Sequence, residues 1–289
     1  MIELVNTVIQ GLLLGGLYAL FAAGLSLAFG VMRLVNIAHG DLIILSAFLG
    51  YAIVEPLGLN PFWVLIVIVP VMGAIGYVLQ RFVLNKTLGD DILPPLLVTF
   101  GLSIIIQNTL LQTFSADSRG LNAGDIETAS VTIGSISLGV YPLLVLFTAV
   151  AVIGGLQYLF NHTSIGRAFR ATSDDQSTAQ LMGIDNKHIY GLAMAIAMGI
   201  VAIAGIYLAI RTNFDPTVGP GRLLYAFEAV IIGGLGSFWG TLAGGMILGV
   251  SQAIGFAIDP GWGILTGHLV FLAVLVVKPN GLFPKTIDR

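Results

Sequence analysis

The residues that could do chemistry in this chain are few, and they lie beside or within long apolar runs. Asp41 and His39 stand just before one such run. Glu228 stands just before another, and His268 lies inside the last one. Ionisable groups at such places are costly in a membrane and often belong to a transport path. The alternative is structural: Asp41 suits a helix N-cap, and a neutral His268 suits a hydrogen bond to the carbonyl of a neighbouring helix.

No enzyme motif accompanies these residues. The sequence has no cysteine, no His-Glu-x-x-His, no Gly-x-Ser-Gly and no cluster of metal ligands. Residues 281–286 lack the glycine before lysine and the spacing of a Walker motif, which cradles nucleotide phosphates. We therefore expect neither a catalytic site nor a metal site, and no cofactor bound by this chain.

The most polar stretch is residues 161–188, which holds three of the twelve Lys and Arg residues and lies between two apolar runs. Ser173 followed by Gln176 matches a capping box, and Gly183 suits a left-handed helix stop. The pattern predicts a short helix over residues 173–183. So short a helix is not stable alone in water. We expect a defined docking surface for a soluble partner; the alternative is a solvated connector.

The composition indicates a membrane protein. Charged residues make up 9% of the 289, against roughly 25% in a soluble domain. Crossing a bilayer takes about 20 apolar residues. We predict one all-α domain over residues 1–289, a polytopic transmembrane bundle in which some elements are broken or re-entrant. Its hydrophobic elements number about eight: 4–32, 42–54, 56–80, 92–116, 128–166, 188–210, 229–258 and 260–277.

Two of these elements are irregular. The run 42–54 is too short to cross unless it recruits residues 36–41. The run 229–258 is either one long tilted helix or two shorter pieces folded back on each other. A third feature is the pairing of 34–51 with 224–249, because each begins polar, breaks at glycine and continues apolar. Paired broken segments are the best sequence pointer to a transporter's binding site. The resulting translocation-path candidates are Asn36, His39, Gly40, Asp41, Glu228, Gly233, Gly234 and Gly236.

Glycine spacing predicts close helix packing. Gly236, Gly240 and Gly244 recur every fourth residue and would form one smooth helix face. Two further sets have similar spacing: Gly245 with Gly249, and Gly11 with Gly15 and Ala19. A pore lining, in which backbone groups meet the substrate, is the alternative.

The distribution of Lys and Arg predicts the orientation, because these residues are enriched in cytoplasmic loops. With residues 161–188 in the cytoplasm, the N-terminus and residues 115–127 lie outside. Nine of the twelve cations then fall inside, and three fall outside: Arg119, Arg211 and Arg222. Three of the nine do so only if 229–258 enters and leaves on the same side: Lys278, Lys285 and Arg289.

Several motifs resemble one family. The segment GRAFRATSDDQSTAQLMGI, residues 166–184, is similar to the cytoplasmic loop of ABC importer permeases of the branched-chain amino acid (LivH) type. Stretches 24–50 and 214–245 agree with it, so the resemblance covers nearly the whole chain. It implies a permease with a cytoplasmic coupling loop at 161–188. The acidic residue that often opens the family's coupling motif is replaced by Gln176-Ser177-Thr178. The ATPase-coupling residues would be Gly166, Arg167, Arg170, Asp174, Ala179 and Gly183.

The resemblance also implies partners and a location. A multi-pass protein of the bacterial inner membrane would pair, within the lipid bilayer, with a paralogous permease or a second copy of itself. It would work with two cytoplasmic subunits that bind ATP and Mg and with a periplasmic substrate-binding protein; nothing indicates nucleic acid. The substrate would be a branched-chain or related amino acid. Urea or short-chain amide permeases share the motifs, and an ion-coupled secondary transporter, which needs intramembrane carboxylates, is a further alternative.

Overall fold

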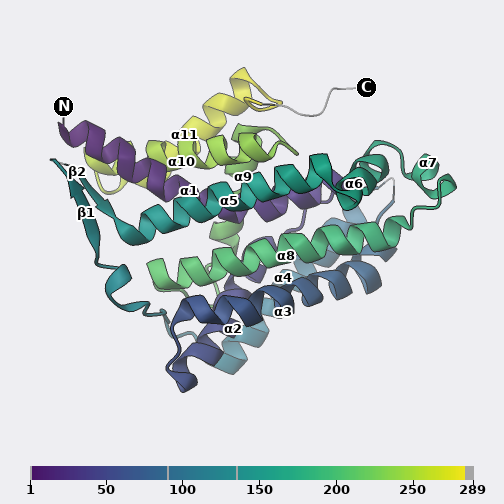
Figure 1. The fold of residues 1–289 in the computed structure, drawn as a ribbon, viewed down its shortest axis with the longest axis horizontal. Coiled ribbons are helices and arrows are strands. Elements are labelled where there is room, and N and C mark those ends of the chain that lie inside the picture. The colour runs from purple at the N-terminus through teal and green to yellow at the C-terminus, as the bar shows by residue number, and fades with distance from the viewer. Residues whose placement is uncertain (1, 90, 135, 284–289) are drawn as a thin grey trace.

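The computed structural model describes residues 2–89, 91–134 and 136–283, and most of them are helical (Figure 1). Within these residues, seven helices are long and apolar enough to cross a membrane, and α11 (Trp262–Val277) is a shorter apolar helix. These eight helices confirm the expected polytopic helical bundle. The seven long helices are α1 (Ile2–Met32), α2 (His39–Leu57), α3 (Pro61–Phe82), α4 (Leu93–Phe114), α5 (Val140–His162), α8 (Asn186–Arg211) and α10 (Phe238–Ile258).

The sequence suggested one apolar element over residues 128–166, and the structure shows that this is wrong. They form a two-stranded antiparallel hairpin, β1 (Ser130–Ile133) and β2 (Ile136–Gly139), followed by α5 and the start of α6 (Ser164–Asp174). The hairpin follows from β-branched residues that alternate with small polar ones around Gly134, which has a φ of 64°. The remaining elements are short: the 3-10 turns η1 (Leu84–Lys86) and η2 (Gly124–Ile126), and the helices α7 (Gln176–Leu181) and α9 (Gly219–Gly233).

Helices α1 and α8 form the centre of the bundle. Both are apolar on all sides, as expected of helices surrounded by others. The glycine spacing seen in the sequence brings α1 and α10 together backbone to backbone: Gly245 and Gly249 lie against Gly11, Gly15 and Ala19. Small residues at such a seam let two helices approach closely. The packing prediction is therefore confirmed for these two sets.

The bundle has two ends, with α6 and α7 at one and the β-hairpin at the other (Figure 1). At the α6–α7 end, Arg81 pairs with Asp185 at 3.1 Å. At the hairpin end, the Leu121 amide donates to Ala209 at 2.8 Å. Residues 115–127 and 161–188 thus lie at opposite ends, as the charge distribution requires.

The C-terminal part of the described chain returns to the α6–α7 end. The Leu282 amide donates to Ile232 at 2.9 Å, next to the turn between α9 and α10. Lys278 therefore lies at the end where the sequence places it, whereas Lys285 and Arg289 lie outside the described residues. Arg222, expected in an external loop, lies in the first turn of α9.

Candidate translocation path and coupling surface

Helix α2 begins inside the bundle. His39 Nε2 lies 2.8 Å from the carbonyl oxygen of Phe21, well inside α1. Residues 33–38, which are not helical, therefore run back from the end of α1 into the protein. The recruitment of residues 36–41 by the short run 42–54 is confirmed from His39 onward, since α2 starts there.

Helix α9 begins where α2 begins. Its first residue, Gly219, lies so close to Gly40 that an added Cβ on Gly40 would overlap the Gly219 carbonyl. Two discontinuous helices thus meet by their N-termini within the bundle, as at the binding sites of transporters. The break that precedes α9 is residues 212–218, which the sequence reading did not single out.

Asp41 lies at this meeting point. Its side chain is 1% exposed, and its Oδ1 accepts from Gln107 Nε2 of α4 at 2.9 Å. Its Oδ2 has no hydrogen-bond partner among the described residues. The N-cap alternative is wrong: α2 starts before Asp41, and Asn36 Oδ1 accepts from the Ala38 amide at 3.0 Å.

Helix α4 presents a polar stripe to this region, and the sequence reading missed it. Thr99 accepts from the Ile37 amide at 3.2 Å, and Gln107 Nε2 lies 3.3 Å from Ser103 Oγ. Thr99, Ser103 and Gln107 are spaced by four residues, which places them on one helix face. That spacing within an apolar run was the available signal.

A second polar cluster joins α1, α9, α10 and α11. Glu228 is 1% exposed and pairs with His268 Nδ1, so the carbonyl partner expected for His268 is wrong. The Tyr225 ring lies 6.4 Å from that of His268, and Tyr18 donates to Gln252 Oε1 at 2.5 Å. Buried ionisable groups held this way are expensive in a membrane and indicate function.

The remaining path candidates from the second stretch form a turn. Gly234 and Gly236, with φ of 104° and 76°, connect α9 to α10 at the α6–α7 end. Gly233 packs backbone to backbone against Gly240. From the sequence, the run 229–258 is either one long tilted helix or two shorter pieces folded back on each other. The second alternative is correct: the pieces are α9 and α10, although α9 already starts at Gly219. Because Gly236 precedes α10, it does not share a helix face with Gly240 and Gly244.

The polar stretch forms two capped helices. Thr163 Oγ1 accepts from the Gly166 amide at 3.0 Å at the start of α6. Asp175 caps α7 by accepting from the Ser177 and Thr178 amides at 2.9 and 3.1 Å. The predicted cap, Ser173, is wrong: it lies in the last turn of α6 and donates to the Gly30 carbonyl at 2.9 Å. A carboxylate at a helix N-terminus also complements the helix dipole, which favours Asp175 in this role.

Electrostatics support this arrangement. The Thr178 hydroxyl, then the Ser177 hydroxyl and the α7 amides, hold the pKa of Asp175 well below its ordinary value. Partial desolvation opposes a lower pKa at Asp185, but the His188 amide and Arg81 outweigh it, so that pKa is also lowered. Asp185 caps α8 by accepting from the His188 amide at 3.2 Å, so Asp175 and Asp185 are two capping carboxylates that stay ionised at neutral pH.

The coupling candidates divide into outward and inward residues. Gly183 has the predicted left-handed conformation, with a φ of 84°. Leu181 and Met182 are 87% and 79% exposed, and Arg167 is exposed on α6. Ala179, by contrast, is buried against the chain itself, and an added Cβ on Gly166 would overlap the backbone of α5.

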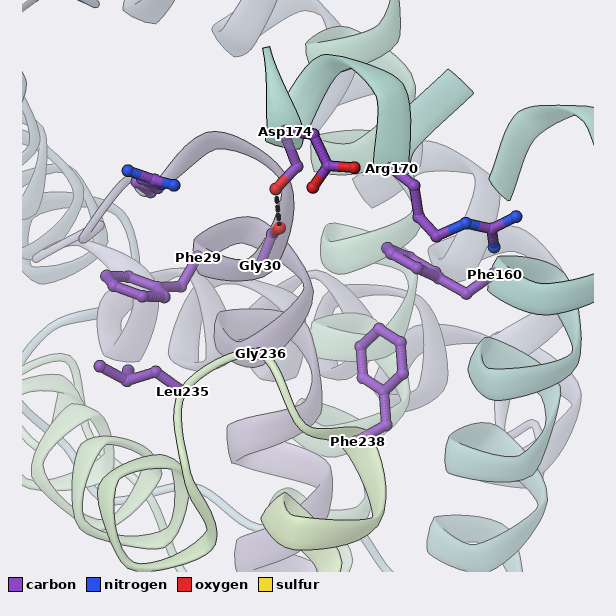
Figure 2. Close-up of a pocket in the computed structure, with 10 residues that line it drawn as sticks. Phe29, Gly30, Phe160, Arg170, Asp174, Leu235, Gly236 and Phe238 are labelled. Carbon is purple, nitrogen blue, oxygen red and sulfur yellow. Dashed lines mark hydrogen bonds between the residues drawn. The ribbon is translucent and has the colours of Figure 1, made fainter. Parts of the chain in front are cut away.

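Arg170 is partly buried on α6, and Asp174 is exposed at the end of the same helix. They line a cavity of about 190 Å³ between α6, the end of α1 and the α9–α10 turn. Phe160 and Phe238 contribute apolar walls below them (Figure 2). Ser173 closes part of the rim through its bond to Gly30, drawn as the dashed line.

A helical membrane bundle with two discontinuous helices meeting inside it, and with a capped polar surface at one end, is a membrane permease. The chain belongs to the family described as the permease component of branched-chain amino acid transport systems, whose model matches residues 7–277. Together with its relatives, this makes it a permease subunit of an ABC importer and a multi-pass protein of the bacterial inner membrane. Such permeases work with ATP-binding and substrate-binding partners, and they are not enzymes.

Individual relatives are similar over most of their length. The permease BraD of Pseudomonas aeruginosa is 27% identical, and the match covers 95% of this chain and 94% of BraD. LivH of Escherichia coli is 26% identical, with 94% and 93% covered. Both are named as high-affinity branched-chain amino acid transport system permeases. The fructose import permease FrcC of Rhizobium meliloti is 30% identical, but the match covers only 64% of this chain and 55% of FrcC.

Proposed function

We propose that this chain conducts branched-chain or similar apolar amino acids into the cell. The observation that carries the proposal is the similarity to BraD and LivH over nearly the full length, since both names state that substrate. The site chemistry is compatible with it. Two helix N-termini would face the carboxylate of an amino acid, and the unpaired oxygen of Asp41 would face its ammonium group.

The proposal includes partners. Two cytoplasmic subunits would bind and hydrolyse ATP with Mg, docking on the surface that Leu181 and Met182 present. A second permease, either a paralogue or another copy of this chain, would complete the path in the bilayer. A periplasmic binding protein would deliver substrate at the hairpin end. Co-purification of the tagged permease from its native membrane, followed by identification of the bound chains, tests this composition.

The substrate is tested by transport in proteoliposomes that contain the complete complex. Labelled leucine should enter in an ATP-dependent manner, whereas labelled urea and labelled fructose should not. Faster uptake of urea or fructose would reassign the substrate. Leucine uptake without ATPase subunits, driven by an ion gradient, would instead favour an ion-coupled secondary transporter.

The path is tested by two neighbouring residues of α4. Gln107→Ala removes the hydrogen-bond donor of a buried Asp41 oxygen, and leaving such an oxygen unsatisfied costs about 1–3 kcal/mol. Leucine uptake should therefore fall by roughly tenfold. Asn108→Ala is the matched control, because Asn108 is exposed and its Nδ2 donates within its own helix to the Ile104 carbonyl at 2.8 Å. Equal uptake by both variants at equal complex yield would place the path elsewhere.

A further inference from the structure

The cavity beneath α6 combines a charged rim with an apolar floor. Its floor is made by aromatic and aliphatic side chains from three parts of the chain: Phe29, Phe160, Leu235 and Phe238. Phe160 and Phe238 meet edge to face with ring centroids 4.9 Å apart, so this wall is well defined. A volume of about 190 Å³ exceeds the ~150 Å³ of an engineered apolar cavity that holds benzene. The floor therefore has room for a branched aliphatic side chain.

The rim carries both signs of charge. Arg33 and Arg170 supply two guanidinium groups, and Asp174 supplies a carboxylate. None of the three forms an ion pair with another residue in the part of the chain that the structure describes. Arg33 also has a φ of 52°, an uncommon backbone conformation for a residue with a side chain. Unpaired charges of opposite sign above an apolar slot suit a ligand that is itself zwitterionic and apolar.

We propose that this cavity binds a free apolar α-amino acid such as leucine. Arg170 holds the carboxylate, and guanidinium–carboxylate pairs are among the strongest charge-assisted hydrogen bonds. Asp174 accepts from the ammonium group, and the side chain enters the slot between Phe29, Phe160 and Phe238. The choice of leucine rests on the proposed function. A phospholipid phosphate fits the arginines but is repelled by Asp174, and a sugar uses neither charge.

The position of the cavity gives the site a consequence for transport. One wall belongs to α6, which leads directly into the coupling helix α7, and the opposite wall is the turn between α9 and α10. A ligand that bridges both walls favours one spacing between them. Transport steps that change this spacing are then opposed, so amino acid accumulated at this end slows further import.

The site is tested by equilibrium binding to the purified permease–ATPase complex in nanodiscs, without the binding protein. The probes are leucine, leucinamide, which lacks the carboxylate, and 4-methylpentanoate, which lacks the ammonium group. Leucine should bind at least about tenfold tighter than either analogue, as expected for the loss of one charged hydrogen bond. Arg170→Gln should abolish only the preference for leucine over leucinamide. Asp174→Asn should abolish only the preference for leucine over 4-methylpentanoate. Lys187 is an exposed cation at the same end that does not line the cavity, so Lys187→Gln should change neither preference.

Three results would overturn the site. The first is that leucine shows no saturable binding. The second is that both variants keep the two preferences of the wild type. The third is that the complex retains anionic lipid through Arg170 and does not bind leucine. ATP-driven leucine uptake with the binding protein, measured on the same complex, separates this inference from the proposed function. Uptake without cavity binding refutes the site alone. Cavity binding without uptake supports the site and refutes the assigned substrate.

Discussion

The packing seam between α1 and α10 allows a quantitative test at Gly15. An added Cβ at this position would lie 2.5 Å from Met246 Cα and 2.6 Å from the Gly245 carbonyl oxygen. Ordinary contact begins at 3.4 Å, and both neighbours are backbone atoms that no rotamer change can move. Gly15→Ala must therefore push the two helices apart by about 0.9 Å. A gap of that size forfeits a quarter to a half of each van der Waals contact along the seam, and we expect a packing cost of about 1–3 kcal/mol.

The matched control is Gly154→Ala in α5, where an added Cβ would meet nothing within 4 Å. Both changes gain the same helix propensity, about 1 kcal/mol, so their difference isolates packing. In thermal unfolding of the purified permease, Gly15→Ala should melt several degrees below Gly154→Ala. Equal melting temperatures, or a comparable loss in Gly154→Ala, would refute the argument that the glycines serve close approach.

Three further predictions concern the coupling surface and the topology. Cysteines at Gln180 and Ser118, both exposed in a chain without native cysteine, should react with an impermeant reagent from opposite sides of the membrane; reaction from the same side would contradict the orientation. Gly183→Val, which forces a β-branched residue to a φ of 84°, should weaken ATPase pull-down and uptake together; normal binding would reduce the segment to a connector. Asp175→Ala should weaken docking while Asp175→Asn, which still caps, should not. Because the folded pKa of Asp175 is lowered, this cap is complete above the ordinary value of about 3.9 and is lost only as pH falls through the lower pKa, so pull-down should be constant from about pH 8 to pH 5.

Burial changes the interpretation of two positions in and beside the segment 173–183. Asn186 follows the coupling segment and reads as an exposed, tolerant position. It is instead buried, and its Nδ2 donates to the Gln176 carbonyl at 2.8 Å, so it helps to hold α7 in place. Ala179 likewise reads as a contact for a partner but packs inward. A short polar segment gives no sign of which side faces its own protein.

The sequence by itself determined the features that depend on local composition. Long uncharged runs predict membrane helices, because lipid accommodates so much apolar surface, and the prediction failed only in part, at the hairpin that opens the run 128–166. The charge pattern separated residues 115–127 from 161–188, and the left-handed stop at Gly183 follows from glycine's lack of a Cβ. The glycine sets of α1 and α10 were visible as spacings, although not as partners of each other.

Tertiary structure decided where distant segments meet. Asp41 reads as a helix cap until α4 and α9 are placed around it, and Gln107 has no reason to be chosen until it is 2.9 Å from that carboxylate. Glu228 and His268 are 40 residues apart in sequence and pair only because α9 and α11 pack side by side. The break before α9 carries local turn signals, Asp215-Pro216 and Gly219-Pro220, and the Thr217 amide donates to Asp215 Oδ1 at 2.8 Å. These signals predict a turn, but they do not show that the turn lies inside the bundle against the start of α2. Such contacts arise from the packing of whole helices, which periodicity and capping patterns do not encode.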